Sequence, residues 1–579
     1  GTLDLDGQLV VAANGTLSAP RGVINLGGHI YANGNYIHNN GTFAPDVTNI
    51  SLHDTSTQVW SFYDLDPAAR FILAKSINVE NELGGASQIR MNGATSTGGA
   101  TITMGTATSA GNIAVGFFGE WGNNTTTRIV AADTSGLNPW TMQSSVNLQL
   151  GIASGAFWEF ANGDIQIATL TTADDYSNAK TITLTGDCEF DAVTVSSGDT
   201  LDLNGQRAEF SGALTQNGPI ADTGGGGLIV CNNYDRTSSN SALDNTSMIV
   251  TGASGTHDYR SPRFGNLMFN LGSSSDEVSF GPFDGCGNLL FGSGTITTTN
   301  SNTWNATNLS IATGGTYNAG DQTLTVAGDF TTSGGLLGAS CLDLEKDNKE
   351  YVRIPVNGST NTHLQSPHTS GAMTVESWVK IESDAEMEVW HKGTDYVLAI
   401  DPSGGATKLA WADGSNYDFS NWQHTLESGQ LNVGKWHHIA CVRDVVGSNG
   451  RISYYIDGKL VGQVTNTSSG ATWTDSDTFD LYVGRYQDSD SGAGQSYFDG
   501  NIENLRIWNV ARTDAQIRES MFTAEYADGT SGLVEQFLFN EGNSHVVAGT
   551  NPTSESTYAN GAGEQYTSSE QANYTGVWA

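Results

Sequence analysis

The sequence predicts an all-β protein whose N-terminal and C-terminal regions are built differently. Gly accounts for 71 of the 579 residues and Pro for only 11, while aromatic residues make up 9%. Disordered low-complexity chains lack this many aromatic residues, whereas turn-rich β proteins contain them. Short alternating segments recur before residue 340, and Lys becomes more frequent after it. We therefore expect a repetitive β region followed by a separate β domain.

The chain is too long for one compact core, since a length of this size corresponds to about two to four domains. Lys75 and Lys180 are the only Lys residues before residue 340. This change in composition indicates a boundary near residue 340. We expect residues 1–185 and 186–340 to form the first and second parts of the repetitive region, and residues 341–579 to form the C-terminal domain.

A degenerate repeat supports the N-terminal assignment. Thr2–Gln8 (TLDLDGQ), Thr200–Gln206 (TLDLNGQ) and Thr316–Gln322 (TYNAGDQ) each indicate a strand followed by a Gly-containing turn. The spacing between copies is irregular, so no fixed period follows. A β-solenoid is the favoured fold, because stacked turns bury a continuous core, and serial β-sandwiches are the alternative. The Trp121–Trp140 segment and the Gly224–Gly227 run interrupt the pattern as inserted loops or a subdomain boundary.

Charge and cysteine content exclude several classes of function. The net charge is −37 and the pI is about 4.3, so the field of the molecule repels nucleic acid. No run of about 18 apolar residues occurs, which argues against membrane insertion. The odd number of cysteines and the absence of a CxxC pair argue against a zinc site or a disulfide framework. The cysteines are Cys188, Cys231, Cys286, Cys341 and Cys441.

The C-terminal region begins with two strand signals. Leu342–Pro355 indicates a strand, an acidic turn and a second strand. In Thr374–Ile381 (TVESWVKI), Val375 and Val379 alternate with Glu376 and Trp378, which predicts opposite faces for the two sets.

Further along, Gly434–Asp444 and Arg451–Gly462 predict strands, with an Asp-Gly hairpin turn at Asp457-Gly458. Asp480–Gly484 predicts another strand, followed by an acidic loop, a strand that ends at Trp508 and a helix that starts at Thr513-Asp514. Gly532–Gly542 and Tyr574–Ala579 complete the predicted domain.

Taken in order, these segments resemble the laminin-G-like and pentraxin family of concanavalin-A-like jelly rolls. The similar pieces are SWVK, KWHHIA, YYIDGKLVG, YFDGNIENLRIWNVART and LVEQFLFNEG. The resemblance implies a jelly-roll sandwich of two antiparallel sheets, with rim loops that hold ligands or Ca²⁺. The whole chain is similar to the fibre and spike proteins on phage surfaces.

The run GRYQDSDSGAGQS resembles the pentraxin metal loop. The resemblance implies Ca²⁺ ligands at Gln487 (through its main-chain carbonyl), Asp488 and Gln495. Tyr486 stands where pentraxins have an acid, and Asp490 is the candidate replacement.

A fifth metal ligand is implied at Asp395, before the strand YVLAI, although Thr394 replaces a second acid of the family. Because Ca²⁺ affinity rises with the number of carboxylates, the two lost acids imply one weakly bound ion. A solvated acidic loop without metal is the alternative.

Two further motifs bear reactive side chains without predicting catalysis. Glu382, Asp384 and Glu386 have the E-x-D-x-E spacing of jelly-roll glucanases, which on a strand places three carboxylates on one face. The resemblance, however, places this segment in a loop, so we expect no catalytic residues. His437 and His438 are adjacent on a predicted strand and point to opposite faces, which predicts structural roles.

Aromatic residues in polar segments are candidates for stacking on sugar rings, with Asp and Asn nearby to bind hydroxyls. Those in predicted strands, Trp378, Trp436 and Trp508, are instead expected in the core. The candidate sugar-contacting residues are Trp411, Tyr417, Trp422 and Trp473.

These observations predict a non-enzymatic virion surface or fibre protein whose C-terminal lectin-like domain binds a cell-surface glycan or receptor. The expected partners also include other virion or surface proteins and further copies of the chain as a homo-oligomer. A bacterial secreted or cell-surface adhesin is the first alternative, with an extracellular location. A polysaccharide-degrading enzyme is the second.

Overall fold

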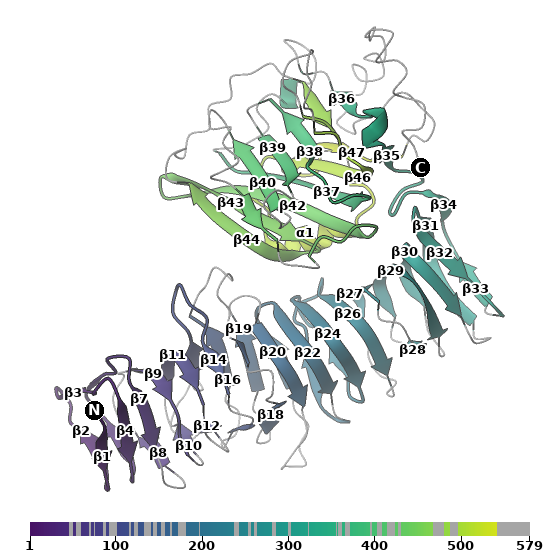
Figure 1. The fold of residues 1–579 in the computed structure, drawn as a ribbon. Coiled ribbons are helices and arrows are strands. Elements are labelled where there is room, and N and C mark those ends of the chain that lie inside the picture. Colours follow the sequence, from purple (N-terminus) through teal and green to yellow (C-terminus); the bar gives the residue numbers. More distant parts are fainter. Residues whose placement is uncertain are drawn as a thin grey trace. The chain divides into compact units, whose positions relative to one another are not determined.

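The protein is almost entirely β-structured and divides into two compact units (Figure 1). In this computed structural model the first unit comprises Gly1–Gly265, Val278–Gly285 and Asn302–Trp304, and the second comprises Asn266–Glu277, Cys286–Ser301 and the chain from Asn305. The segments outside the described residues are 46–49, 54–58, 69–70, 74–75, 85–88, 92–100, 115–116, 121–125, 133–140, 143–146, 152–156, 162–164, 172–180, 196, 237–242, 253–255, 260–262, 281–284, 299–302, 322, 355, 357–361, 365–370, 394–395, 402–407, 414–422, 427–429, 467–479, 487–495, 528 and 541–579.

The N-terminal part of the chain is a β-solenoid of about 10 turns, which confirms the favoured prediction over serial sandwiches. Each strand pairs in parallel with the strand one turn later. Leu3 pairs with Ile24, and Ile24 with Phe43, so one turn takes about 20 residues.

Three parallel ladders run along the solenoid. One contains β1 (Leu3–Leu5), β4 (Val23–Leu26), β7 (Thr42–Pro45), β9 (Trp60–Leu65), β11 (Ile77–Leu83), β14 (Asn112–Ile113), β17 (Thr141–Met142), β20 (Ile165–Thr171), β22 (Cys188–Val195), β24 (Arg207–Gln216), β26 (Leu228–Arg236) and β27 (Leu243–Val250). The second contains β2 (Leu9–Val11), β5 (Ile30–Ala32), β8 (Ile50–His53), β10 (Phe71–Leu73), β12 (Ile89–Met91), β15 (Phe117–Glu120) and β18 (Asn147–Gly151) and continues in β20, β22, β24 and β26. The third starts in β9 and β11 and contains β13 (Thr101–Met104), β16 (Thr126–Ala131), β19 (Phe157–Ala161), β21 (Thr181–Leu184), β23 (Thr200–Asp202) and β25 (Ile220–Ala221). The two-stranded sheet of β3 (Thr16–Ser18) and β6 (Asn35–Ile37) accompanies the first turns, and β28 is Thr256–Tyr259.

Long strands take part in two ladders because they bend. The register of β22 and β24 shifts between Phe190 and Val193, and that of β24 and β26 shifts between Phe210 and Ala213. Inward-facing side chains stack along the axis, as in the pair of Phe190 and Phe210, whose ring centroids lie 5.2 Å apart. This stacking gives a continuous apolar core along the described turns.

The Gly224–Gly227 run is a turn of the solenoid and not an inserted loop or a boundary. It joins β25 to β26, and β26 pairs in parallel with β24 of the preceding turn. The carboxylate of Asp222 accepts hydrogen bonds from the N–H groups of Gly205 (2.7 Å) and Gly227 (2.8 Å). One acid therefore orders the turns of two successive rungs. Most of the other interrupting segment, Trp121–Trp140, lies outside the described residues.

The second unit begins with further parallel strands. The bounds in this region are β29 (Phe264–Phe280), β30 (Cys286–Thr298), β31 (Thr303–Ala312), β32 (Gly315–Asn318), β33 (Thr323–Val326) and β34 (Phe330–Gly334). An asparagine ladder crosses three rungs: the Asn288 amide donates to Asn266 Oδ1 (2.7 Å), and the Asn308 amide donates to Asn288 Oδ1 (2.9 Å). The Asn288 side chain thus both donates and accepts a hydrogen bond, and this chain of amides fixes the register of the rungs.

The rest of the second unit is a sandwich of two antiparallel sheets (Figure 1). The seven-stranded sheet has the order β35 (Leu342–Leu344), β46 (Gly500–Trp508), β37 (Met373–Ile381), β42 (Trp436–Val446), β43 (Asn449–Ile456) and β44 (Lys459–Asn466), and β47 (Leu533–Phe537) also pairs with β46. The six-stranded sheet has the order β36 (Val352–Ile354), β45 (Leu481–Val483), β38 (Met387–Lys392), β39 (Tyr396–Asp401), β40 (Lys408–Asp413) and β41 (Gln423–Thr425). The helices are α1 (Asp514–Met521) and the short η2 (Lys346–Asn348) and η3 (Thr362–Leu364).

Local sequence signals account for the connections of the sandwich. Asp457 and Gly458 both have positive φ (49° and 73°), as the two-residue hairpin turn between β43 and β44 requires. Gly500 has φ 136°, and a Cβ at this position would collide with the carbonyl oxygen of Lys380. Thr513 caps α1, as predicted. In the described part of the chain no helix is long and apolar enough to cross a membrane.

The parallel strands of the second unit are hydrogen-bonded directly to the sandwich. The Asn270 amide donates to the Trp436 carbonyl oxygen (2.5 Å), and the Trp436 N–H donates back to Asn270 Oδ1 (3.1 Å). The Trp436 indole also donates to the carbonyl oxygen of Thr313 (3.2 Å). These contacts come from elements of one compact unit, so the last turns and the sandwich share a polar joint.

Candidate functional site

The five predicted Ca²⁺ ligands lie outside the described residues. They are Asp395, Gln487, Asp488, Asp490 and Gln495. The two ends of the acidic loop are described, and they form a stem. Arg485 and Tyr497 form an antiparallel bridge, and the Tyr486 N–H donates to the Ser496 carbonyl oxygen at 3.3 Å. The loop is therefore held closed at its base, as the prediction of a strand, a loop and a returning strand requires.

The described residues nearest to Asp395 and those at the stem of the acidic loop lie beside different ends of β38. The described neighbours of Asp395, Gly393 and Tyr396, lie at the C-terminal end of β38. Ser496, at the stem of the acidic loop, instead donates to Glu386 (3.0 Å), which precedes β38. The strand has 6 residues and so spans roughly 20 Å. The described ends of the two segments therefore lie at opposite ends of β38.

The E-x-D-x-E motif lies in a bend and not on a strand. Glu382, Asp384 and Glu386 connect β37 to β38, and all three are exposed. Glu382 forms an ion pair with Lys380 at 2.9 Å, while Glu386 contacts Ser496. The glucanase arrangement, with three carboxylates on one face of a strand, is therefore absent at these residues. Sequence reasoning missed Glu386 as a neighbour of the acidic loop, because the two segments are 110 residues apart.

The predicted sugar-contacting side chains also lie outside the description. Tyr417, Trp422 and Trp473 are in segments that the structure does not describe. Only the backbone of Trp411 is described: it lies in β40 and pairs with Leu398 of β39. Among the described residues, no group of three or more His, Cys, Asp or Glu side chains is placed to hold a metal ion.

The adjacent histidines have separate partners, as predicted for opposite faces of a strand. His437 Nδ1 lies 2.7 Å from Asp457 Oδ2, and its Nε2 accepts the Asn432 N–H at 3.0 Å. His437 therefore braces the hairpin turn at Asp457. His438 is buried on the other face, 3.8 Å from Glu376. Burial lowers the pKa of His438 well below its usual value, and nearby arginines add to this effect, so the ring is neutral.

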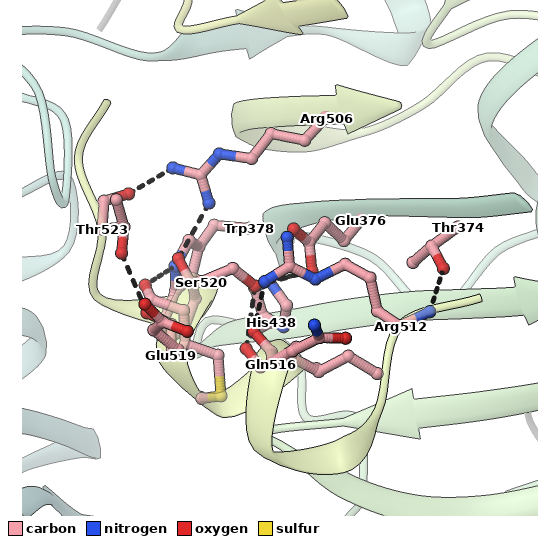
Figure 2. A network of polar contacts seen from close by, with 12 residues as sticks. Thr374, Glu376, Trp378, His438, Arg506, Arg512, Gln516, Glu519, Ser520 and Thr523 are labelled. Atoms are coloured by element: carbon pink, nitrogen blue, oxygen red, sulfur yellow. Dashed lines mark hydrogen bonds and ion pairs between the residues drawn. The ribbon is translucent and has the colours of Figure 1, made fainter. Parts of the chain in front are cut away.

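Glu376 is the centre of a buried polar network between the seven-stranded sheet and α1 (Figure 2). Its carboxylate accepts the Trp508 indole N–H at 2.9 Å and the Ser520 hydroxyl at 2.7 Å. The indole of Trp378 donates to the Met521 carbonyl oxygen at 2.7 Å. Residues on β37 and β46 thus hold the C-terminal turn of α1 against the sheet.

Two arginines complete this network. Arg506 donates to the Ser520 carbonyl oxygen at 2.8 Å and to Gln536 Oε1 at 3.2 Å. Figure 2 also shows its hydrogen bond to the Thr523 carbonyl oxygen. Arg512 lies 3.8 Å from the centroid of the Trp508 ring. Because the side chains of these two arginines are at least nine-tenths buried and have partners within the protein, the network stabilises the fold and is not a ligand site.

A second cluster of cationic and aromatic side chains lies beside the acidic loop. The Cζ of Arg485 is 4.5 Å from the ring centroid of Tyr351 and 5.4 Å from that of Tyr482. The Tyr351 and Tyr497 rings are 6.4 Å apart. Arg353, on the neighbouring strand β36, forms an ion pair with Asp480 at 2.6 Å. No sequence motif indicated this cluster, because its members come from three separate segments.

Together these features define a lectin-like β-sandwich in a chain that also carries a β-solenoid. Residues 347–518 match the family model of the concanavalin A-like lectin/glucanase superfamily, which confirms the resemblance inferred from the sequence. No protein with a curated description matches the chain.

The solved structures that are similar to the chain include the following three. A Bacteroides ovatus protein assigned to carbohydrate binding is 18% identical, with a TM-score of 0.29 over 39% of this chain and 58% of that one. The chain thus covers less than two thirds of that protein. A heptameric SAP-like pentraxin from Limulus polyphemus is 17% identical, with a TM-score of 0.20 over 31% and 84%. The enzymatically active domain of tailspike protein 2 from bacteriophage CBA120 is 10% identical, with a TM-score of 0.25 over 93% and 82%.

Proposed function

We propose that this chain is a non-enzymatic virion surface protein whose C-terminal sandwich binds a cell-surface glycan. The observation that carries the proposal is the match of residues 347–518 to a lectin-like superfamily, together with the two-sheet sandwich that these residues form. The solenoid supports a structural role, since its ladders provide a stiff, repetitive element without the use of helices.

The position of the candidate acids favours binding over catalysis. The glucanase-like chemistry considered from the sequence needs its three carboxylates on one strand face. Glu382, Asp384 and Glu386 lie in an exposed bend, and Glu382 is paired with Lys380. Incubating the full chain with capsular and algal polysaccharides should release no reducing ends. Release that is lost in Glu382→Gln would establish an enzyme instead.

Glycan binding is tested by applying the full chain to a glycan array. We expect binding to one glycan class, and we expect Trp411→Ala or Trp422→Ala to weaken it roughly fivefold or more, because stacking on an aromatic side chain contributes about 1–3 kcal/mol in the recognition of nucleic-acid bases. Phe330→Ala is the matched control, since Phe330 is an exposed aromatic residue of β34, outside the sandwich. A chain that binds no glycan, or variants that bind like the control, would contradict the proposal.

We further propose that the acidic loop binds one Ca²⁺ weakly. Millimolar Ca²⁺ should then raise the melting temperature of the chain, because a ligand that binds only the folded state stabilises it. The increase should disappear in Asp488→Asn and persist in Glu519→Gln, which removes an exposed acid from α1. Absence of both a titration heat and a thermal shift would show that the loop is only a solvated acidic surface.

The proposed location on a virion can be tested independently of glycan binding. Antibodies against the sandwich should label particles at regular positions, and light scattering should give a symmetric homo-oligomer in solution. Labelling of a bacterial surface without particles would support the adhesin alternative.

A further inference from the structure

Arg485 is a buried arginine that has no ion-pair partner among the described residues. It follows β45 and is only 7% exposed, and its Nε is sealed from solvent without a hydrogen-bond partner. Within the part of the chain that the structure describes, its guanidinium makes neither an ion pair nor a hydrogen bond. A charge removed from water in this way is costly unless an opposite charge meets it.

The neighbouring aromatic rings orient this guanidinium but leave its donors free. Tyr351 and Tyr482 lie 4.5 and 5.4 Å from its Cζ, and cation–π attraction offsets part of the cost of burial. Guanidinium carries five N–H donors in its own plane, and a ring face cannot accept all of them. Among the described residues, no planar group accepts hydrogen bonds from the edge of the guanidinium.

Asp480, whose charge acts on the neighbouring Tyr482, is not available as a counter-charge for Arg485. The Asp480 carboxylate is already used on both oxygens: one pairs with Arg353 at 2.6 Å, and the other accepts the Val356 N–H at 2.8 Å. Burial raises the pKa of Tyr482, so its phenol stays protonated and supplies no negative charge.

Other buried arginines of the sandwich differ from Arg485. Arg506 donates to the Ser520 carbonyl oxygen, and Arg512 donates to the Gln516 carbonyl oxygen at 2.6 Å. Arg506 and Arg512 therefore bind main-chain oxygens, whereas the described contacts of the Arg485 guanidinium are with aromatic rings.

We propose that Arg485 binds the carboxylate of an acidic sugar, a uronic or sialic acid, within the glycan that the sandwich recognises. The inference rests on the proposed glycan-binding function and adds the class of sugar. A carboxylate fits because its two oxygens match two parallel N–H donors of a guanidinium. The net charge of −37 does not prevent this contact, because at physiological salt charges more than about 8 Å away are largely screened.

The test uses the full chain on an array that carries uronate and sialoside glycans, each printed beside its carboxyl-reduced counterpart. The wild type should bind the acid at least tenfold more tightly than the reduced form, since hydrogen bonds to charged groups contribute on this scale. Arg485→Met keeps the apolar stem against the tyrosines and should abolish the preference. Arg485→Lys keeps the charge without the planar fork and should retain only part of it.

Arg451→Met is the matched control, because Arg451 is a half-buried arginine on β43 that pairs with Asp444 of the adjacent strand β42. It should bind like the wild type. An Arg485→Met protein with an undiminished preference for the acid overturns the proposal. If the chain binds glycans but no carboxyl group matters, the glycan function stands and the carboxylate site is refuted. If no glycan binds but sodium glucuronate raises the melting temperature through Arg485, the glycan function fails and the carboxylate site stands.

Stability without ligand separates this role from a structural one. An unpaired buried charge is not expected to stabilise the fold, so Arg485→Met should melt at or above the wild-type temperature. A clear decrease in melting temperature, together with unchanged glycan preference, would assign Arg485 a purely structural role.

Discussion

Glu503 lies at the joint between the parallel strands and the sandwich, and its protonation predicts how the stability of that joint depends on pH. It lies on β46, fully buried, and its carboxylate faces the connection between β34 and β35. Oε2 accepts the Leu336 N–H at 2.5 Å, and Oε1 accepts those of Leu337 at 2.9 Å and Gly338 at 2.6 Å. One side chain thus satisfies three consecutive amides of the connection.

Burial raises the pKa of Glu503 from 4.5 to about 7, against the three amides and Arg506, which favour the charged form. The folded state therefore holds the proton more tightly than the unfolded state does. The corresponding stability is fully present below about pH 4.5 and is lost as the pH rises through about 7. A shift of this size corresponds to about 3 kcal/mol.

The perturbation is Glu503→Gln, which keeps the shape of the side chain and is neutral at every pH. Urea unfolding of the full chain, followed by the fluorescence of the buried tryptophans, gives the free energy of the sandwich transition at each pH. Relative to Glu503→Gln, the wild type should lose about 2.5 kcal/mol of stability between pH 5 and pH 8. Glu519→Gln, at an exposed acid, should show no such trend. A difference that is constant or grows with pH would mean that the three amides keep the carboxylate ionised, and it would refute the reasoning.

Three other substitutions test the remaining contacts. Glu376→Ala should cost about 3–5 kcal/mol in urea unfolding, because it leaves the Trp508 indole and the Ser520 hydroxyl unpaired in a buried site; a cost below about 1 kcal/mol would show that the network is dispensable. Asn288→Ala interrupts the asparagine ladder and should cost about 1–3 kcal/mol, seen as faster amide exchange in β30 and β31, and unchanged exchange would contradict it. Gly500→Ala should prevent the native pairing of β46 with β37, so a soluble variant with the wild-type melting temperature would be evidence against the described backbone.

Local signals made much of the sandwich predictable. The turn at Asp457-Gly458 needs positive φ at both positions, and Asp-Gly is the common solution. Thr513 and Gln516 form a reciprocal capping box at the start of α1, a signal that is readable from four residues. Such features depend on near neighbours in the chain, so the sequence alone can predict them.

The sequence favoured a solenoid but left serial sandwiches open as an alternative. Alternation of apolar residues within a short strand is the same in both folds. What distinguishes them is the partner strand, which in the solenoid lies one turn away. That distance varies, since Ile24 pairs with Phe43 whereas Ile113 pairs with Met142, and this variation hides the period.

The polar network under α1 was not predictable for a related reason. Thr374–Ile381 alternates in sequence as a strand with one polar face would, yet every residue of β37 is buried. The element that covers the second face includes Ser520 and Met521, more than 140 residues later. A buried Glu and a solvated Glu look alike in sequence until the covering element is known.

The placement of basic side chains also changes what the net charge implies. From a charge of −37 the sequence excludes partners that bind through long-range attraction of many phosphates. It does not exclude a partner with one carboxylate, because that contact forms within a few ångströms, inside the screening length. Arg443 and Arg506 are buried, and their contacts are with main-chain and side-chain oxygens of the sandwich itself. Arg485 is also buried, although it is 7% exposed, and the described contacts of its guanidinium are with the rings of Tyr351 and Tyr482. An acidic protein can therefore recognise an acidic sugar, provided that the recognition depends on one oriented guanidinium and not on the field of the whole molecule.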